Sequence, residues 1–277
     1  MTTVGSHLPV GRSARRIGGF DAGELLSLAE RAAWQAASLV RGTGLPLGVR
    51  RKRENEGIVT SLDRVVEECI REEILAARPD DCFLGEELGP RVGNSGVEWI
   101  VDPIDGTNNF VTGLSQWSIS IAVRIGSQIV VGVVHLPATG ETYTASVGSG
   151  ARCQGVPISG REGAGSIGDA VVATGFASSQ AARFAQLKQL GRVVGVVRDI
   201  RCHGAASLEI CKVANGQLDG YYESGLNLWD VAAAGLVALE AGVELSGAPW
   251  SGSGTLVAAR PHLADPLRRL VDPVSGG

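Results

Sequence analysis

The sequence predicts a mixed α/β protein, and three patterns along the chain support this class. Residues 117–147 alternate apolar and polar side chains around turns such as Gly126-Ser127, which is typical of an antiparallel meander of strands. Residues 21–39 and 61–74 instead repeat apolar residues at helical spacing. After residue 170, predicted strands and helices alternate as in an α/β unit. At 277 residues, the chain can bury a substantial core.

The first half of the chain is expected to begin with two helices. Asp21 and Glu24 resemble a capping box at the start of the first helix. Thr60-Ser61 can begin the second helix, and Pro79 ends it. Asp63 lies in the first turn of this second helix, where the helix dipole favours an acidic side chain for structural reasons alone.

The second half is expected to alternate strands with helices. The Gly-rich stretch 159–168 is interpreted as a connector between two subdomains of one domain, approximately 20–160 and 161–277, and residues 1–19 as a flexible tail. The elements predicted beyond the connector are strands at 170–174, 193–197 and 219–223, and helices at 179–191, 204–215, 230–242 and 261–270.

Composition argues against several classes of function. The formal net charge of −4 provides no basic surface for nucleic acid, so no nucleic-acid partner is expected. The five cysteines are odd in number and contain no Cys-x-x-Cys pair, which favours reduced thiols in the cytoplasm. The sequence has no apolar run of the length of a signal peptide or a membrane span. We therefore expect a cytoplasmic protein without a membrane partner.

The stretch WIVDPIDGTNNF, residues 99–110, carries the strongest functional signal. A short apolar strand runs into two carboxylates, Asp102 and Asp105. Pro103 fixes its own φ and biases Asp102 toward an extended conformation, so both carboxylates can converge on one point. Carboxylate oxygens are the ligands that Mg²⁺ prefers. The alternative is a plain Asp-Gly turn preceded by a solvated strand end.

The residues that follow these acids can form an anion site. Gly106 permits a sharp turn of the backbone, and Thr107 with the two asparagines after it supplies capping groups where a helix can begin. Free N–H groups at such a helix start bind anions. A metal site and a phosphate site would therefore be contiguous.

Two further acidic positions adjoin apolar segments and support a metal site. Glu86 follows the apolar segment 82–84 within the sequence GEE, and Asp230 opens the apolar run of WDVAAAG. The motifs GEE, WIVDPIDGTNNF and WDVAAAG, in this order, resemble the signature of the inositol monophosphatase family of Mg²⁺-dependent phosphomonoesterases. The resemblance extends over about residues 57–257.

The resemblance implies a fold and a set of metal ligands. The fold is a layered α/β/α/β/α sandwich of the inositol monophosphatase and fructose-1,6-bisphosphatase type, in which residues 20–277 form the catalytic domain. Two or three Mg²⁺ ions are expected, with Mn²⁺ as a possible substitute. Glu86, Asp102 and the carbonyl of Ile104 would bind the first ion, and Asp102, Asp105 and Asp230 the second.

The resemblance also assigns catalytic roles. In the family, the aspartate of a VTxxD segment, which matches Asp63, accepts a hydrogen bond from the threonine that matches Thr107. Thr107 and Glu86 would then position and deprotonate the attacking water, and the N–H groups of Gly106 and Thr107 would hold the phosphate. The expected reaction is direct displacement by metal-activated water, without a covalent intermediate.

The substrate side is assigned by the same resemblance. Ala206 and Glu223, with Asp105 and Asp230, would face the alcohol portion of the substrate, and Glu223 suits the hydroxyl groups of a polyol. Myo-inositol 1-phosphate is therefore the best single candidate. His203 stands where many family members carry a small or apolar residue, so it could contact a different leaving group, or it could be packed or solvated without a role.

The sequence is also compatible with other substrates and with another class of function. Histidinol phosphate, a nucleotide or an aminosugar phosphate could be the substrate in a biosynthetic pathway. A non-catalytic protein that binds a protein or RNA partner with the same fold is a remote alternative, which the complete acid set argues against. The resemblance further implies a homodimer and inhibition by lithium.

Overall fold

The computed structural model describes residues 16–42, 50–51, 58–59, 61–159, 163–248 and 253–272. The predicted tail lies outside these residues up to residue 15, and Thr60 lies outside them too. The helices in the described part of the chain are α1 (Ala22–Gly42), α2 (Ser61–Ala77), α3 (Thr107–Thr112), α4 (Gln180–Val193), α5 (Ala206–Ala214), α6 (Leu228–Glu240) and α7 (Pro261–Val271), with a 3₁₀ turn at Ile167–Asp169.

The larger sheet has eight strands and contains the predicted meander. Its order is β12-β11-β10-β9-β8-β7-β5-β6, and every neighbouring pair is antiparallel except β5 with β7. The strands are β5 (Cys82–Gly85), β6 (Gly89–Arg91), β7 (Val97–Asp105), β8 (Ser118–Ile125), β9 (Gln128–Leu136), β10 (Glu141–Ser146), β11 (Ala151–Cys153) and β12 (Val156–Ile158).

The smaller sheet has five strands in the order β14-β13-β15-β17-β16, and β13 is parallel to both of its neighbours. Its strands are β13 (Val171–Thr174), β14 (Asp199–Arg201), β15 (Gly220–Ser224), β16 (Glu244–Ala248) and β17 (Ser253–Ala259). Two short hairpins complete the strands of the described residues, formed by β1 (Arg16–Ile17) with β2 (Phe20–Asp21) and by β3 (Arg50–Arg51) with β4 (Ile58–Val59).

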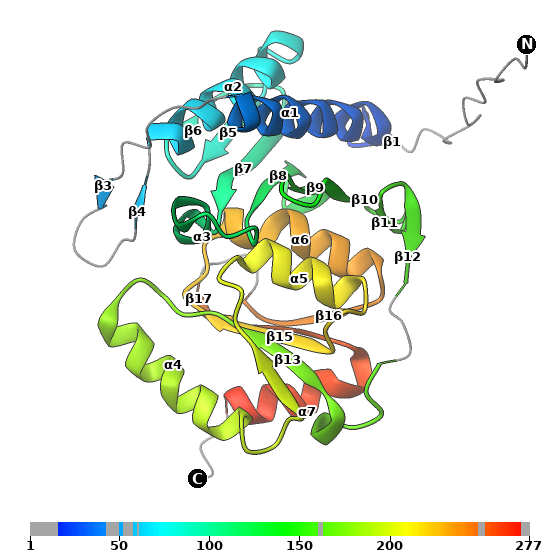
Figure 1. The fold of residues 1–277 in the computed structure, drawn as a ribbon. Coiled ribbons are helices and arrows are strands. Elements are labelled where there is room, and N and C mark those ends of the chain that lie inside the picture. Colours follow the sequence, from blue (N-terminus) through cyan, green and yellow to red (C-terminus); the bar gives the residue numbers. More distant parts are fainter. Residues whose placement is uncertain are drawn as a thin grey trace, which may run out of the picture.

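Five layers alternate along the molecule (Figure 1). Helices α1 and α2 cover one face of the eight-stranded sheet, α5 and α6 lie between the two sheets, and α4 and α7 cover the outer face of the five-stranded sheet. Each interface is filled by a cluster of buried apolar side chains. This α/β/α/β/α arrangement confirms the predicted fold class. The two sheets lie on either side of the predicted connector, and the division into subdomains stays a prediction.

One predicted strand is wrong. The apolar run at 193–197 is not extended, because α4 continues to Val193 and the chain then turns before β14. Val193 and Val197 are buried, whereas Val194 and Val196 are exposed. Burial four residues apart fits a helical end rather than a strand. Helix α6 also begins earlier than predicted, so that Asp230 is its third residue.

The packing of α6 on the larger sheet requires small residues. A Cβ atom at Gly132 of β9 would lie 2.5 Å from the carbonyl oxygen of Ala233, so the helix and the strand are in direct backbone contact there. In the described part of the chain, no helix has the length and apolar character needed to cross a membrane.

Candidate metal and phosphate site

The two acids of the WIVDPIDGTNNF stretch lie on the same face of β7 because the strand contains an irregularity. Asp102 pairs with Ser120 of β8, and Asp105 pairs with Ser118. Two residues of β7 between these pairs therefore lie opposite a single residue of β8. Without the extra residue, side chains three positions apart would point to opposite faces. Pro103 lies inside this irregularity, where a ladder donor is not needed. The Ile104 N–H donates to Asp102 Oδ1 at 3.0 Å.

Gly106 makes the turn from β7 into α3. Its φ of 92° lies in the left-handed region, and a Cβ atom there would be 3.0 Å from the Gln116 carbonyl oxygen and from the Ala205 side chain. Only glycine fits this position without strain. Helix α3 begins at the next residue, so the backbone of Gly106 and Thr107 lies directly beside the carboxylates of β7.

Thr107 and Asp63 are brought together from distant parts of the chain. The Thr107 hydroxyl lies 3.1 Å from Asp63 Oδ1 and 3.0 Å from the Ile104 carbonyl oxygen. Both neighbours are acceptors, so the hydroxyl hydrogen is directed at them, and a lone pair of Thr107 Oγ1 is available to another group. Asp63 is buried near the start of α2.

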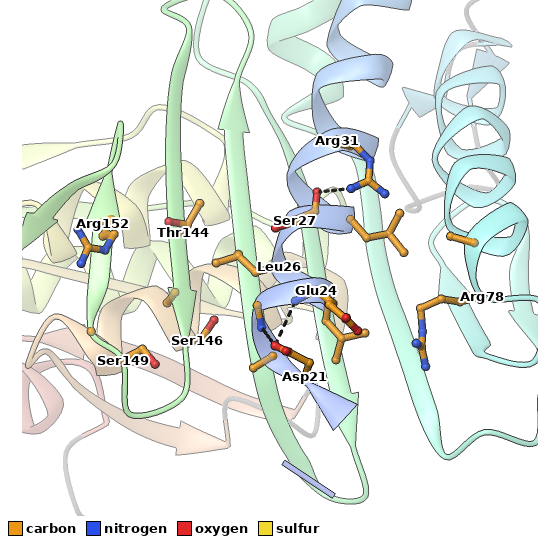
Figure 2. Close-up of a pocket in the computed structure, with 17 residues that line it drawn as sticks. Asp21, Glu24, Leu26, Ser27, Arg31, Arg78, Thr144, Ser146, Ser149 and Arg152 are labelled. Carbon is orange, nitrogen blue, oxygen red and sulfur yellow. Dashed lines mark hydrogen bonds between the residues drawn. The ribbon is translucent and has the colours of Figure 1, made fainter. Parts of the chain in front are cut away.

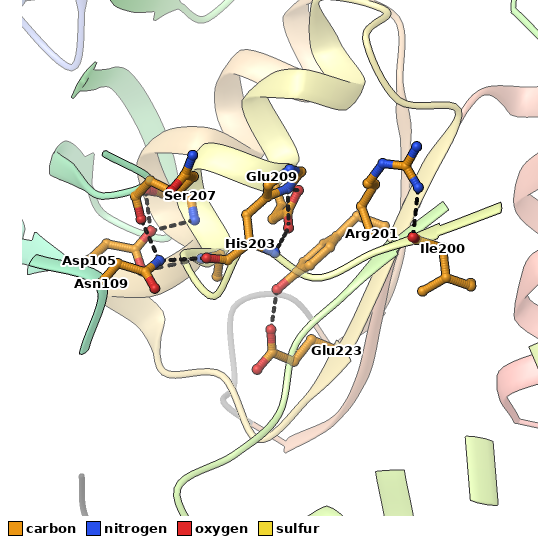
Figure 3. A network of polar contacts seen from close by, with 11 residues as sticks. Asp105, Asn109, Ile200, Arg201, His203, Ser207, Glu209 and Glu223 are labelled. Atoms are coloured by element: carbon orange, nitrogen blue, oxygen red, sulfur yellow. Dashed lines mark hydrogen bonds and ion pairs between the residues drawn. The ribbon is translucent and has the colours of Figure 1, made fainter. Parts of the chain in front are cut away.

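Asp105 is held by the start of α5. The Ala206 N–H donates to its Oδ1 at 3.2 Å, and the Ser207 N–H and hydroxyl donate to its Oδ2 at 2.7 and 2.6 Å. Burial raises the pKa of Asp105 to about 6, although the bonds from Ser207 and Ala206 lower it. The network in Figure 3 shows this contact between the larger sheet and α5.

The remaining acids lie close enough to repel one another. Burial raises the pKa of Asp102 well above its usual value, and the charges of Glu86, Asp105, Asp230 and Asp63 raise it further. Burial, followed by the charge of Asp105, also raises the pKa of Asp230, which accepts a hydrogen bond from the Asn227 N–H at the start of α6. The elements α2, β7 and α6 and the turn after β5 therefore concentrate negative charge in one place.

The carboxylates do not form a closed coordination shell. Within the ranges that the structure describes, no group of three or more His, Cys, Asp or Glu side chains is arranged so that it could hold a metal ion as it stands. The acids are neighbours whose oxygens must approach further to share an ion. Mg²⁺ commonly uses only one or two protein carboxylates and completes its shell with water and substrate phosphate.

Sequence reasoning missed Glu67, which supports the position of Glu86. Glu67 is fully buried on α2 and accepts hydrogen bonds from the N–H groups of Glu87 and Leu88 at 2.7 and 2.9 Å. Burial raises its pKa to about 7. A Cβ atom at Gly85 would lie 1.9 Å from its Oε1, so the glycine makes room for it. Glu67 follows Asp63 by one helical turn, and this spacing is a signal that could have indicated it.

Two of the residues predicted for the alcohol side, His203 and Glu223, are drawn together with Asp105 in Figure 3. Glu223 of β15 accepts a short hydrogen bond from the Tyr221 hydroxyl, and burial raises the Glu223 pKa to about 7. His203 pairs with Glu209, a residue that sequence reasoning also missed. Ala206 contributes its backbone N–H to Asp105. We refer to Asp63, Glu86, Asp102, Asp105 and Asp230 as the acid cluster. The structure thus places His203, Ala206 and Glu223 on the side of this cluster where α5 lies.

A large cavity of about 820 Å³ lies elsewhere in the molecule (Figure 2). It is lined by the start of α1, the end of α2 and residues of β10 and β11, including Asp21, Arg78 and Arg152. Asp63 is near the start of α2 and Ala77 at its end, so about 21 Å of helix lies between Asp63 and the cavity lining. None of the predicted site residues lines the cavity.

Comparison with known proteins identifies relatives over most of the chain. Residues 21–271 match the inositol monophosphatase family. An inositol-1-monophosphatase SuhB of Mycobacterium tuberculosis is 37% identical over 265 residues, which cover 88% of this chain and 91% of the relative. A Nus factor SuhB of Pasteurella multocida is 34% identical over 262 residues, covering 90% and 96%.

Solved structures agree with the sequence relatives. The crystal structure of extragenic suppressor protein suhB from Bartonella henselae has a TM-score of 0.83 at 32% identity and covers 90% of this chain and 99% of that one. A structure of IMPase/NADP phosphatase complexed with NADP and Ca²⁺ shares the fold, with a TM-score of 0.81 at 19% identity over 93% and 98% of the two chains. The chain belongs to the inositol monophosphatase family.

Proposed function

We propose that the protein is a divalent-metal-dependent phosphoric monoester hydrolase, with myo-inositol 1-phosphate as the best candidate substrate. The observation that carries the proposal is the set of acids gathered at the end of β7, beside the Thr107–Asp63 hydrogen bond. Membership of the inositol monophosphatase family supports the reaction class. Relatives named inositol-1-monophosphatase support the substrate.

The chemistry of the donor set fits a hard divalent cation. Burial and, to a lesser extent, like charges raise the pKa values of Asp102 and Asp105, so a cation would relieve repulsion between these acids. We propose Mg²⁺ as two or three ions, held by Glu86, Asp102 and the Ile104 carbonyl and by Asp102, Asp105 and Asp230. When bound, the ions supply charge neutralisation, a more acidic water and stabilisation of the leaving oxygen.

The chain's own residues position the reacting groups. Because the Thr107 hydroxyl hydrogen is directed at Asp63 and Ile104, its oxygen can accept a hydrogen bond from the attacking water. Glu86 is the second group proposed to orient this water and remove its proton. The backbone N–H groups of Gly106 and Thr107 are proposed to hold the phosphate.

The alcohol side is proposed to consist of His203, Ala206 and Glu223 together with Asp105 and Asp230. Glu223 lies on the smaller sheet, and its charge interacts with that of Asp105 on the larger one, which supports a shared cleft wall. Histidinol phosphate, nucleotides and aminosugar phosphates are the alternative substrates. Relatives named Nus factor support a further alternative, in which the fold binds a protein or RNA partner.

Phosphate release from a panel of esters tests the proposal. The panel contains myo-inositol 1-phosphate, histidinol phosphate, fructose 1,6-bisphosphate, nucleoside phosphates and sugar phosphates, each with Mg²⁺ and with EDTA. We expect the inositol ester to have the highest kcat/KM and EDTA to abolish turnover. A different leading substrate would replace inositol phosphate, and a lack of turnover on every ester with Mg²⁺ present would reject the hydrolase and favour partner binding.

A further inference from the structure

We propose that His203 is a specificity-determining residue, whose Nε2 atom forms a hydrogen bond with a hydroxyl group of the leaving alcohol while Glu209 holds the ring in place. The inference rests on the proposed hydrolase function. It narrows the substrate class to phosphate esters of alcohols that carry further hydroxyl groups close to the ester.

Glu209 fixes both the ring and the backbone of His203. The Nδ1 atom lies 2.8 and 2.9 Å from the two carboxyl oxygens, and the His203 N–H donates to Oε1 at 2.7 Å. The Glu209 side chain is only 1% exposed, so water does not compete for it. An ionised carboxylate only accepts, so Nδ1 carries the hydrogen. Nε2 therefore remains for a second partner, and a hydroxyl group can bind it as donor or as acceptor.

The loop that carries His203 is tied to the acid cluster on both sides. The Asn109 side-chain amide of α3 donates to the carbonyl oxygens of His203 and Gln116. Three residues after His203, the start of α5 binds the Asp105 carboxylate. The histidine is thus held between two elements that both adjoin the Asp105 turn, and Figure 3 shows these residues in one network.

The Nε2 atom is available to a substrate. The His203 side chain is 25% exposed, and among the described residues its hydrogen bonds are made by Nδ1. The backbone N–H already gives Glu209 a partner, so the ring is not needed to satisfy that carboxylate. A partly exposed ring in one fixed orientation is suited to recognition, because little conformational freedom remains to be lost on binding.

The charge around His203 selects the kind of group that can approach it. Glu223 lies close enough to Glu209 and to Asp105 for their charges to interact, and the Tyr221 hydroxyl already donates to Glu223. A second phosphate or carboxylate on the substrate would be repelled by this concentration of acids. A hydroxyl group is neutral and can form a hydrogen bond with Nε2. A polyol phosphate therefore fits this wall better than a bisphosphate.

Replacing the ring tests the inference against substrates that differ in hydroxyl groups. The measured quantity is the ratio of kcat/KM for myo-inositol 1-phosphate to kcat/KM for ethyl phosphate. For His203→Ala, we expect this ratio to fall about three- to tenfold, because one hydrogen bond to the alcohol is lost. Most of the fall should come from a higher KM for the inositol ester. The matched control is His262→Gln at an exposed histidine of α7, where the ratio should not change. A ratio that stays within twofold in His203→Ala overturns the inference.

Binding of the alcohol alone gives an independent readout. Long-range ¹⁵N NMR of the histidines should show a hydrogen on Nδ1 of His203, and addition of myo-inositol with phosphate and MgCl₂ should shift the Nε2 signal. In Glu209→Leu, no side-chain acceptor remains for Nδ1, so the fixed tautomer should be lost. An Nε2 signal that does not respond to inositol overturns the inference. A wild-type protein that hydrolyses no phosphate ester rejects the proposed function instead, and the Nε2 response then decides the role of His203 by itself.

Discussion

At the scale of single residues, the Asp102 carboxylate is proposed to bind both metal ions, and it is surrounded by other acids. We expect Asp102→Asn to lower the rate by roughly a hundredfold or more, because several kcal/mol of transition-state stabilisation depend on this charge. Steady-state phosphate release with saturating Mg²⁺ measures the effect. Activity within a few-fold of the wild type would contradict the assignment.

The same substitution separates a catalytic role from a structural one. Asn keeps the shape of Asp102 and removes a charge that Glu86 and Asp105 repel, so the metal-free variant should be at least as stable as the wild type. Asp265→Asn is the matched control, since Asp265 is an exposed acid of α7 that pairs with Arg268. It should change neither the rate nor the response to metal.

The buried histidine His135 is expected to make the protein less stable in acid. Burial and, to a lesser extent, the charge of nearby Arg41 together lower its pKa from 6.5 to about 4. The His135 side chain therefore binds a proton more readily in the unfolded chain than in the folded protein. Protonation does not reduce the unfolding free energy above pH 6.5, but as the pH falls toward 4 it lowers this free energy by up to about 3 kcal/mol. Denaturant unfolding at several pH values should show that His135→Gln removes this part of the pH dependence. Parallel curves for the two proteins would exclude His135 as the cause.

At the scale of elements, the contact between α6 and β9 controls the position of Asp230. Gly132→Ala places a methyl group 2.5 Å from the Ala233 carbonyl oxygen, so we expect a loss of about 1–3 kcal/mol in unfolding free energy and lower activity as α6 shifts. Gly191→Ala in α4 meets no atom within 4 Å and should stabilise by up to about 1 kcal/mol. Urea unfolding compares the two. If both substitutions changed the unfolding free energy equally, the close contact at Gly132 would not be the cause of the loss.

At the scale of the whole molecule, metal binding should stabilise the fold. The proposed ligands come from the turn after β5, from β7 and from α6, so an ion that they share holds separate elements together. At a Mg²⁺ concentration of 100 times Kd, stabilisation of about 2.7 kcal/mol is expected. Thermal unfolding with MgCl₂ and with EDTA measures it, and Asp102→Asn should reduce the shift. Identical midpoints for the wild type in both solutions would remove the support for a shared ion.

The sequence predicted most of the fold because its signals are local. The meander, the two N-terminal helices and the C-terminal helix are each encoded by periodicity and turn residues within one segment. The contacts of Glu67 and Glu209 could not be predicted in this way. Glu67 binds N–H groups 20 and 21 residues away, and such partners are known only once α2 lies against β5. The strand predicted at 193–197 was wrong because the burial of these residues depends on the packing around α7.

The two sheets contribute different parts of the site. Asp102 and Asp105 belong to the larger sheet, whereas Glu223 belongs to the smaller one and His203 to the loop that leaves it. Under the proposed function, the alcohol-side residues that are not also metal ligands, His203, Ala206 and Glu223, are therefore encoded in one short stretch of the gene. A duplicated copy could acquire a new substrate through changes confined to 199–224, while the hydrolytic apparatus is inherited intact. The same separation makes this short segment the place to begin a directed change of substrate.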